Sequence, residues 1–345
     1  MDTDTEKRLR IVFMGSSSAS AVCLHALLRE PLLEVVGVVT QPDRPSGRGK
    51  ELRPCKLAEY AAASGVAEVV KTENVNADEP MARIRAWNPD VIAVVAFGQI
   101  LKKPLLELPP HGCVNCHFSL LPKYRGAAPV IAALAAGDRK TGVTVMHMGV
   151  GLDDGPIMLQ SYEPIYPDTT GGALMNDLAL AGGVTLAKAL VLMLRNELPP
   201  EIPQDPQYAT YVKKLRKTDG LIDWTAPALE IERKIRAYSP WPGSYTFLPV
   251  RLRGKRGATG RVGVLKASVF TKLEPAWREA APGTVLKTIV SLPKGEDGPR
   301  GPVVRCGDTA LILTELKPDG SAAMDGGAFL MGRPLAAGED VLLNA

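Results

Sequence analysis

The sequence lacks a hydrophobic run long enough to cross a membrane. Its longest apolar stretch, 185–194, contains Lys188 and is far shorter than the roughly 20 residues that a spanning helix needs. Residues 1–6 are acidic and polar, without the apolar core of a secretory signal or the arginine-rich character of a transit peptide. No period repeats along the chain, which argues against a solenoid. We therefore expect a globular protein with no membrane partner.

The cysteines form neither a disulfide framework nor a complete zinc site. There are 5, an odd and scattered set that is typical of a reducing compartment. Cys113 and Cys116 match a C-x-x-C spacing, but the sequence has no second pair to complete a tetrahedral site. In a strand, residues three apart point to opposite faces. We expect no metal and no redox role for this pair.

Two common catalytic and binding motifs are also missing. The segment Gly15-Ser16-Ser17-Ser18 ends a predicted strand without the G-x-G-x-x-G pattern, so a dinucleotide site is not indicated. Such a turn either holds an anion or merely caps the following helix with a serine. Ser119 lacks the G-x-S-x-G elbow of hydrolases. The sequence therefore gives no sign of an activated nucleophile.

The first 198 residues predict an α/β domain with a Rossmann-like, mostly parallel sheet. Residues 90–98 form a near-continuous apolar run, as expected of a strand buried on both faces. Strands and helices alternate around it, which favours parallel pairing. Strands are predicted at 9–15, 33–40, 66–70, 90–98, 112–118, 141–148 and 155–165, and helices at 19–28, 54–63, 78–87, 127–136 and 174–196.

A proline-rich break at 199–212 predicts a linker between domain 1–198 and domain 213–345. After it come an amphipathic helix, 227–238, and short strands separated by turns, which predict a small β-barrel. These strands lie at 244–248, 262–270, 283–286, 289–292, 302–306 and 311–316. The window 213–278 holds 15 basic and 5 acidic residues. This excess indicates a polyanion partner, or else a solvated surface that is basic by chance.

Three side chains at predicted strand ends suggest a catalytic site. Asn115 and His117 are two residues apart at the end of one strand, so they face the same side of the sheet. Asp153 follows a later strand in a glycine-bounded turn. An amide can stabilise an oxyanion, a carboxylate can orient an imidazole, and one of the latter pair can move a proton. The trio suits attack of an amine on an acyl carbon, although such a trio can also be purely structural.

Longer motifs resemble the methionyl-tRNA formyltransferase family. The similar segments are 40–50, 115–129, 142–146 and 151–155 in the first domain, and 208–209, 214–217, 222–224 and 235–243 after the predicted linker. The resemblance covers about residues 9–320 and implies that an OB-like β-barrel follows the Rossmann-like domain. It also implies 10-formyltetrahydrofolate as the formyl donor, no metal, and initiator methionyl-tRNA as the acceptor.

The resemblance assigns roles to particular residues. Asn115, His117 and Asp153 would be catalytic, with Asn115 and a protonated His117 stabilising the oxyanion and Asp153 accepting the amine proton. The turn formed by Ser119, Leu120, Leu121 and Pro122 would contact the folate. Arg44, Arg48 and Lys50, in the loop 42–50, would meet the tRNA acceptor end, and Lys213 and Lys214 would bind tRNA at the start of the basic window. We expect a monomer.

Some positions depart from the family pattern and leave alternatives open. Phe118 stands where Gly or Ala is usual, so it either narrows the pocket or packs behind the strand. Asp154 stands where Thr is common, and a second carboxylate beside Asp153 would raise the pKa of one of them. The Gly15–Ser18 start weakly favours an organellar enzyme. We expect a mitochondrial or plastid matrix location in a eukaryote and a cytoplasmic one in a bacterium.

Two other functions fit parts of the sequence. Formyltransferases of small amines, such as glycinamide ribonucleotide or an amino-sugar nucleotide, share the trio but need neither the basic second domain nor the loop 42–50. A catalytically silent RNA-binding relative would keep the fold but has no need of the intact trio.

Overall fold

The computed structural model describes residues 7–46, 49, 51–66, 68–252, 255–292 and 296–342. The chain divides into two compact units. The first comprises Met1–Val130, Arg139–Ile165 and Leu174–Lys213, and the second comprises Ile131–Asp138, Tyr166–Ala173 and Lys214–Ala345. The segment 199–212, predicted as a linker, thus belongs to the first unit. It contains a 3-10 turn, Pro206–Tyr208, and the short strand β11, Tyr211–Val212.

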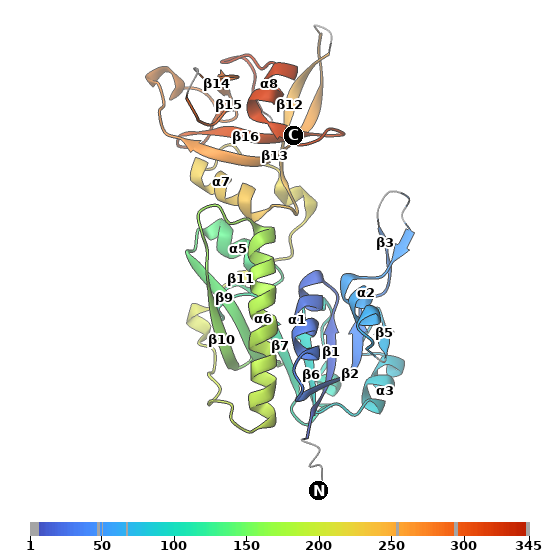
Figure 1. The fold of residues 1–345 in the computed structure, drawn as a ribbon. Coiled ribbons are helices and arrows are strands. Elements are labelled where there is room, and N and C mark those ends of the chain that lie inside the picture. Colours follow the sequence, from blue (N-terminus) through green and yellow to red (C-terminus); the bar gives the residue numbers. More distant parts are fainter. Residues whose placement is uncertain are drawn as a thin grey trace. The chain divides into compact units, whose positions relative to one another are not determined.

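A seven-stranded sheet forms the centre of the first unit (Figure 1). Its order is β10-β9-β7-β6-β1-β2-β5. The strands are β1 (Leu9–Gly15), β2 (Leu33–Thr40), β5 (Val69–Lys71), β6 (Val91–Val95), β7 (Cys113–His117), β9 (Lys140–His147) and β10 (Ile157–Pro164). The pairs β7–β6, β6–β1, β1–β2 and β2–β5 are parallel, whereas β9 and β10 add antiparallel pairs at one edge. The predicted α/β, mostly parallel sheet is confirmed.

Helices alternate with these strands along the chain. They are α1 (Ser18–Leu28), α2 (Lys56–Ala63), α3 (Asp78–Ala86), α4 (Lys103–Leu106), α5 (Pro129–Ala136) and α6 (Gly171–Leu194). All of them except the short α4 were predicted from the sequence. The serine turn before α1 acts as a cap: the Ser17 hydroxyl accepts from the Ser20 amide at 3.0 Å, and the Ser20 hydroxyl donates to the Val95 carbonyl at 2.6 Å. The hydroxyls of Ser17 and Ser20 thus have hydrogen-bond partners without any ligand. This agrees with the interpretation of the turn as a helix cap.

Although no uninterrupted apolar run of that length was found in the sequence, helix α6, which includes Asp177 and Lys188, is long and apolar enough to cross a membrane by length and composition alone. Its packing explains that composition differently. A Cβ added at Gly182 would lie 3.0 Å from both Cys116 Sγ and Phe118 Cε1, and one at Gly183 would lie 2.9 Å from the Ala26 Cβ. These contacts are close enough that α6 lies against β7 and α1 as a core helix. One face of the helix, including Leu178, Leu186 and Leu190, is buried, whereas Leu180 and Val184 are exposed.

Two short strand pairs emerge beside the main sheet. Strands β3 (Arg44–Ser46) and β4 (Glu51–Arg53) form an antiparallel hairpin in the segment that was predicted as a loop. Strand β8 (Arg125–Gly126) pairs in parallel with β11, because the Arg125 amide donates to Thr210 and the Ala127 amide donates to Val212. The second pair attaches the segment 204–212 to the end of β7.

The second unit is built on a six-stranded antiparallel sheet, which confirms the β-rich second domain. Its strands are β12 (Ser244–Leu252), β13 (Lys255–Phe270), β14 (Val285–Ile289), β15 (Gly301–Arg305), β16 (Ala310–Pro318) and β17 (Met324–Asp325), with helices α7 (Ala228–Ala237) and α8 (Gly326–Gly332). Trp224, Ile231, Ile235, Leu313 and Phe329 lie in its core. The prediction of separate strands at 283–286 and 289–292 is wrong, since β14 spans the gap between them.

Candidate functional site

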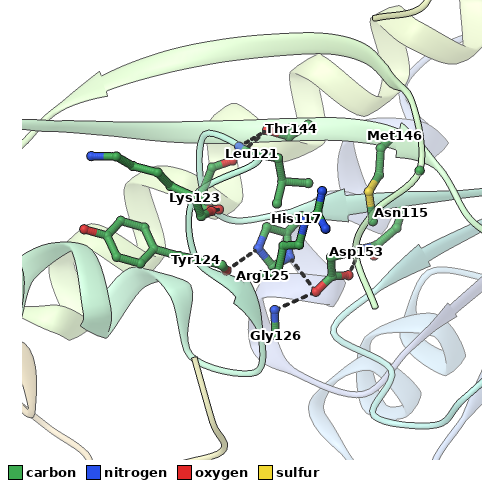
Figure 2. Close-up of polar contacts among 12 residues, drawn as sticks. Asn115, His117, Leu121, Lys123, Tyr124, Arg125, Gly126, Thr144, Met146 and Asp153 are labelled. Atoms are coloured by element: carbon green, nitrogen blue, oxygen red, sulfur yellow. Dashed lines mark hydrogen bonds and ion pairs between the residues drawn. The ribbon is translucent and has the colours of Figure 1, made fainter. Parts of the chain in front are cut away.

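Asn115, His117 and Asp153 come together at the carboxyl end of β7 (Figure 2). The two β7 side chains share a face because they are two residues apart. The Asn115 amide donates to Asp153 Oδ1 at 3.4 Å, and His117 Nδ1 lies 3.7 Å from Asp153 Oδ2. His117 is buried and Asp153 is 15% exposed at its side chain. The carboxyl ends of parallel strands are where ligands bind in such sheets.

The Asp153 carboxylate is also held by the main chain of β8. The Gly126 amide donates to Asp153 Oδ2 at 2.7 Å. Gly126 has φ +110°, and a Cβ there would lie 2.3 Å from the Val212 carbonyl oxygen, so this position requires glycine. Asp153 itself has φ +50°, a conformation that non-glycine residues rarely adopt.

The hydrogen bonds of His117 determine its tautomer. Nε2 lies 2.9 Å from the Tyr124 carbonyl oxygen, which can only accept, so Nε2 carries a hydrogen. Burial lowers the pKa of His117, and this effect outweighs the opposing influences of the Asp153 carboxylate and the Tyr124 carbonyl. The lowered pKa favours the neutral imidazole, in which the lone pair of Nδ1 faces Asp153. The protonated His117 that the sequence led us to expect during the reaction stays a prediction.

The turn from Ser119 to Pro122 is fixed by a buried threonine. The Thr144 hydroxyl donates to the Ser119 carbonyl at 2.7 Å and accepts from the Leu121 amide at 3.1 Å. The Gln160 amide donates to the Leu121 carbonyl at 3.1 Å, and the Leu121–Pro122 peptide is cis. Figure 2 shows the Thr144 contact. The hydrogen bonds of Thr144 and Gln160 thus fix the shape of the turn beside His117.

Within this turn the four residues predicted to bind folate are not equivalent. Ser119 is fully buried, and its hydroxyl donates to the Lys123 carbonyl at 2.7 Å. Leu121 is also buried, whereas Leu120 and Pro122 are partly exposed. The Ser119 hydroxyl therefore maintains the shape of the turn, and the accessible surface of the turn belongs to Leu120 and Pro122.

Sequence reasoning missed three polar residues around the site. Thr144 pairs with His117 in the register of β7 and β9, a relationship that only the strand alignment reveals. Gln160 lies on β10, and Gln204 lies in the predicted linker. The Gln204 amide donates to the carbonyls of Asp153 and Gly155. A single glutamine in a proline-rich stretch carries no sequence signal for this role.

The thiols of Cys113 and Cys116 lie next to carbonyl groups of two different helices. The Cys113 thiol lies 3.6 Å from the Leu105 carbonyl near α4, and the Cys116 thiol lies 3.7 Å from the Gly182 carbonyl on α6. Burial raises the pKa of Cys113 to about 12, and contact with the Cys23 thiol, together with burial, raises the pKa of Cys116 well above its usual range. Both cysteines are packing residues. In the described part of the chain, no group of three or more His, Cys, Asp or Glu side chains is arranged to hold a metal.

The structure shows where the side chains of Phe118 and Asp154 lie, which the sequence could not decide. Phe118 is buried and lies against Gly182, so it packs behind β7 on the α6 side. Asp154 is exposed, and its carboxylate occupies the space that a side chain at Gly151 would fill. Among the described residues, neither of these two side chains forms a hydrogen bond with Asn115 or His117.

The basic residues predicted to bind tRNA lie on exposed segments where they are described. Arg44 forms an ion pair with Glu73 at 3.1 Å, and its side chain is 62% exposed. Lys213 and Lys214 are exposed at the end of the first unit and the start of the second. Arg48 and Lys50 lie outside the described residues.

Comparisons with known proteins show which family the chain resembles. Residues 9–190 match the family model "Formyl transferase", and residues 214–334 match "Formyl transferase, C-terminal domain". The chain is 43% identical to the methionyl-tRNA formyltransferase of Symbiobacterium thermophilum over 94% of this chain and 92% of that protein. It is 40% identical to that of Myxococcus xanthus over 96% of this chain and 97% of that protein.

A solved structure shares the fold. The N-formyltransferase of Helicobacter canadensis, in complex with folinic acid and dTDP-3-aminofucose, matches with a TM-score of 0.55 at 16% identity, over 90% of this chain and 99% of that chain. With both family models matched in order and curated relatives aligned along nearly their full length, the chain belongs to the methionyl-tRNA formyltransferase family.

Proposed function

We propose that this protein transfers a formyl group from 10-formyltetrahydrofolate to the amino group of methionine carried by initiator tRNA. The observation that carries the proposal is the convergence of Asn115, His117 and Asp153 at the end of β7. The amide, the imidazole and the carboxylate are the groups that amine attack on an acyl carbon requires. The identity to named methionyl-tRNA formyltransferases along both domains supports the choice of acceptor.

The formyl donor would be held beside the turn Ser119–Pro122. The turn suits a flat apolar ligand, because hydrogen bonds fix its shape and its partly exposed residues, Leu120 and Pro122, are apolar. The related fold from Helicobacter canadensis holds folinic acid, a reduced folate, which supports a folate in this role. The donor supplies the formyl carbon, and the protein residues supply hydrogen bonds and proton transfer.

Asn115 would stabilise the developing oxyanion. Its Nδ2 donates to Asp153 over a long distance of 3.4 Å, so this amide is oriented but only weakly engaged. An amide donor fixed beforehand stabilises negative charge as it forms on the formyl oxygen, since no reorganisation is needed during the reaction. This is the same role that we expected for Asn115 from the sequence.

His117 and Asp153 would accept the proton that the amine loses. In the neutral tautomer the Nδ1 lone pair faces a carboxylate across 3.7 Å, with no hydrogen between them. Protonation at Nδ1 converts this arrangement into a charge-assisted pair, which Asp153 stabilises. The neutral imidazole is thus the base, and Asp153 stabilises its protonated form.

The acceptor RNA would be bound by the exposed basic residues. We retain Arg44, Lys213 and Lys214, together with Arg48 and Lys50, as the residues that contact its backbone. Phosphate contacts of this kind release counterions, so binding of the RNA should weaken steeply as the salt concentration rises. The excess of basic residues in the window 213–278 supports this role for the second domain.

The test is an acceptor-selection assay with the full chain. We expect formyl transfer from 10-formyltetrahydrofolate to methionyl initiator tRNA, and no comparable transfer to glycinamide ribonucleotide or to an amino-sugar nucleotide. Uncharged initiator tRNA is the matched control, because it offers the same backbone without the amine. Transfer to the small amines alone would overturn the proposed acceptor. No transfer to any acceptor would instead indicate a silent RNA-binding relative.

A further inference from the structure

Gln204 connects the main chain of Asp153 to a buried arginine. Its Nε2 donates to the carbonyl oxygens of Asp153 at 2.9 Å and of Gly155 at 2.7 Å. Its Oε1 accepts from Arg125 Nε at 3.1 Å and from Arg125 Nη2 at 2.8 Å. Both N–H groups and the oxygen of this amide are therefore engaged.

The orientation of the Gln204 amide is fixed by the chemistry of its partners. A guanidinium only donates hydrogen bonds and a carbonyl only accepts them, so the oxygen must face Arg125 and the nitrogen must face Asp153 and Gly155. A flipped amide would place donor against donor and acceptor against acceptor. Arg125 thereby determines that Gln204 presents two donors to the turn that contains Asp153.

Arg125 is placed in an unusual environment for a cation. Only 5% of its surface is exposed. Its side-chain partners among the described residues are neutral: the Gln204 oxygen and the Tyr211 hydroxyl at 3.2 Å. Burying a charge is costly unless hydrogen bonds satisfy it, so the contacts with Gln204 and Tyr211 are important for holding the guanidinium in this place.

The turn that contains Asp153 has an unfavourable backbone conformation, which its surroundings must stabilise. Asp153 has φ +50°, and residues in this region persist when the surrounding structure fixes them. The Gln204 amide binds the carbonyl of Asp153 itself and that of Gly155, two residues later. The residue after Arg125, Gly126, donates to the Asp153 carboxylate. Strand β8 and its partner segment therefore hold both the main chain and the side chain of Asp153.

We propose that Arg125 and Gln204 are positioning residues, which hold Asp153 so that its carboxylate faces His117 and Asn115. Neither side chain needs to touch a substrate for this role. The inference deepens the proposed function, because the reaction affected is the formyl transfer at the trio. Loss of the Gln204 donors should release the turn and withdraw the carboxylate from His117.

Two variants of Gln204 separate positioning from simple packing. Gln204→Leu removes both ends of the connection at similar volume. Gln204→Glu keeps an oxygen for Arg125 but replaces the N–H donors that Asp153 and Gly155 require. Gln207→Leu is the matched control, since Gln207 lies in the same segment and its side chain bonds to exposed Asp205.

In steady-state kinetics we expect both Gln204 variants to lower kcat by about 10- to 100-fold, the loss typical of a catalytic group misplaced by about 1 Å. KM for each substrate should stay within about twofold of the wild-type value, because substrate-contacting residues are unchanged. Gln207→Leu should match the wild type. Unchanged kcat in a folded Gln204→Glu protein would overturn the inference.

A second measurement does not depend on activity. The titration of the His117 imidazole is followed by NMR in the protein without substrates, with His117→Asn identifying its signals. Because the Asp153 carboxylate raises the pKa of His117, Gln204→Leu should give a lower value than the wild type and Gln207→Leu. Gln204→Glu is not used here, because its own carboxylate would raise the pKa. An unchanged value in folded Gln204→Leu would contradict the positioning role. This titration still decides the matter if the wild type fails to formylate methionyl-tRNA.

Discussion

Asp153 Oδ2 lies 3.7 Å from His117 Nδ1 while His117 Nε2 donates to the carbonyl oxygen of Tyr124. The imidazole therefore has one nitrogen committed to the main chain and one left facing a carboxylate. A proton arriving at Nδ1 would be stabilised by that carboxylate, and no rearrangement of the ring is needed to receive it. This relationship divides the trio into a base, a group that stabilises its charged form, and an oxyanion donor.

Asp153→Asn should abolish most of the activity. The amide keeps the volume of the carboxylate but removes its negative charge, so a protonated His117 is no longer stabilised. We expect kcat to fall by about 10²-fold or more, the usual loss for a general acid–base group. Steady-state kinetics with methionyl-tRNA measures this, and near-normal turnover would exclude the assigned role.

The pH dependence should reveal a neutral His117. The acceptor amine must be neutral to attack, so log kcat/KM should fall with a slope of one below its own pKa. Protonation of His117 removes the base and lowers kcat/KM further, so the slope of log kcat/KM against pH rises to two. Burial lowers the pKa of His117, so the steeper region should begin below about 6.5, the ordinary value for histidine. A slope that never exceeds one, even well below this pH, would indicate that the protonated imidazole is the active form.

Asn115→Ala should lower kcat without weakening the site's structure. Removal of a single oxyanion donor typically costs about 10²- to 10³-fold in rate. Asn115→Asp serves as a companion variant: it places a second carboxylate where the amide donates to Asp153 Oδ1, so it should be at least as inactive. Circular dichroism checks that both proteins are folded. Comparable activity of Asn115→Ala and the wild type would contradict an oxyanion role.

Thr144→Val should affect the donor rather than the acceptor. It removes the hydroxyl that bonds the Ser119 carbonyl and the Leu121 amide, so the turn loses its fixed shape. We expect KM for 10-formyltetrahydrofolate to rise by about 10-fold, equivalent to about 1.4 kcal/mol of binding free energy. Thr141→Val, on the same strand but its opposite face, is the control. A rise in KM for methionyl-tRNA alone would contradict the predicted folate contact.

Phe118→Ala should reduce stability much more than substrate binding. The ring is buried against Gly182 of α6, so its removal leaves a cavity behind β7. Phe to Ala substitutions in cores cost about 3–5 kcal/mol of unfolding free energy. Urea denaturation measures this loss, and KM for the folate should stay near the wild-type value in the protein that remains folded. A large change in KM with unchanged stability would place the ring in the donor site.

The sequence predicted the parts of the fold that depend on local pattern. The apolar run 90–98 contains β6, and the segment 174–196, predicted as a helix, largely coincides with α6. Asn115 and His117 lie on the same face because side chains two residues apart in a strand point the same way. Asp153 was predicted through the family resemblance and its glycine-bounded turn. In each case the residues that carry the signal are neighbours in sequence, or belong to a motif that is specific in combination.

The remaining features depend on contacts between distant segments. Gln204 reaches Asp153 only because β11 pairs with β8, and a two-residue parallel pairing has no recognisable sequence pattern. The β3–β4 hairpin was predicted as a loop, since its strands are only three residues long. The lowered pKa of His117 follows from its burial, and the hydrogen on its Nε2 follows from the position of the Tyr124 carbonyl. Neither property can be obtained from residue identities.

The most direct test of the account is a single-turnover reaction of the wild type and Asp153→Asn with formyl-labelled 10-formyltetrahydrofolate and methionyl initiator tRNA. The amino acid is released from the RNA by mild base and identified by mass spectrometry. We predict N-formylmethionine from the wild type, and at most about 1% of that rate from Asp153→Asn, as expected for loss of a general acid–base group. Unformylated methionine from the wild type, or equal rates from both proteins, would contradict the account.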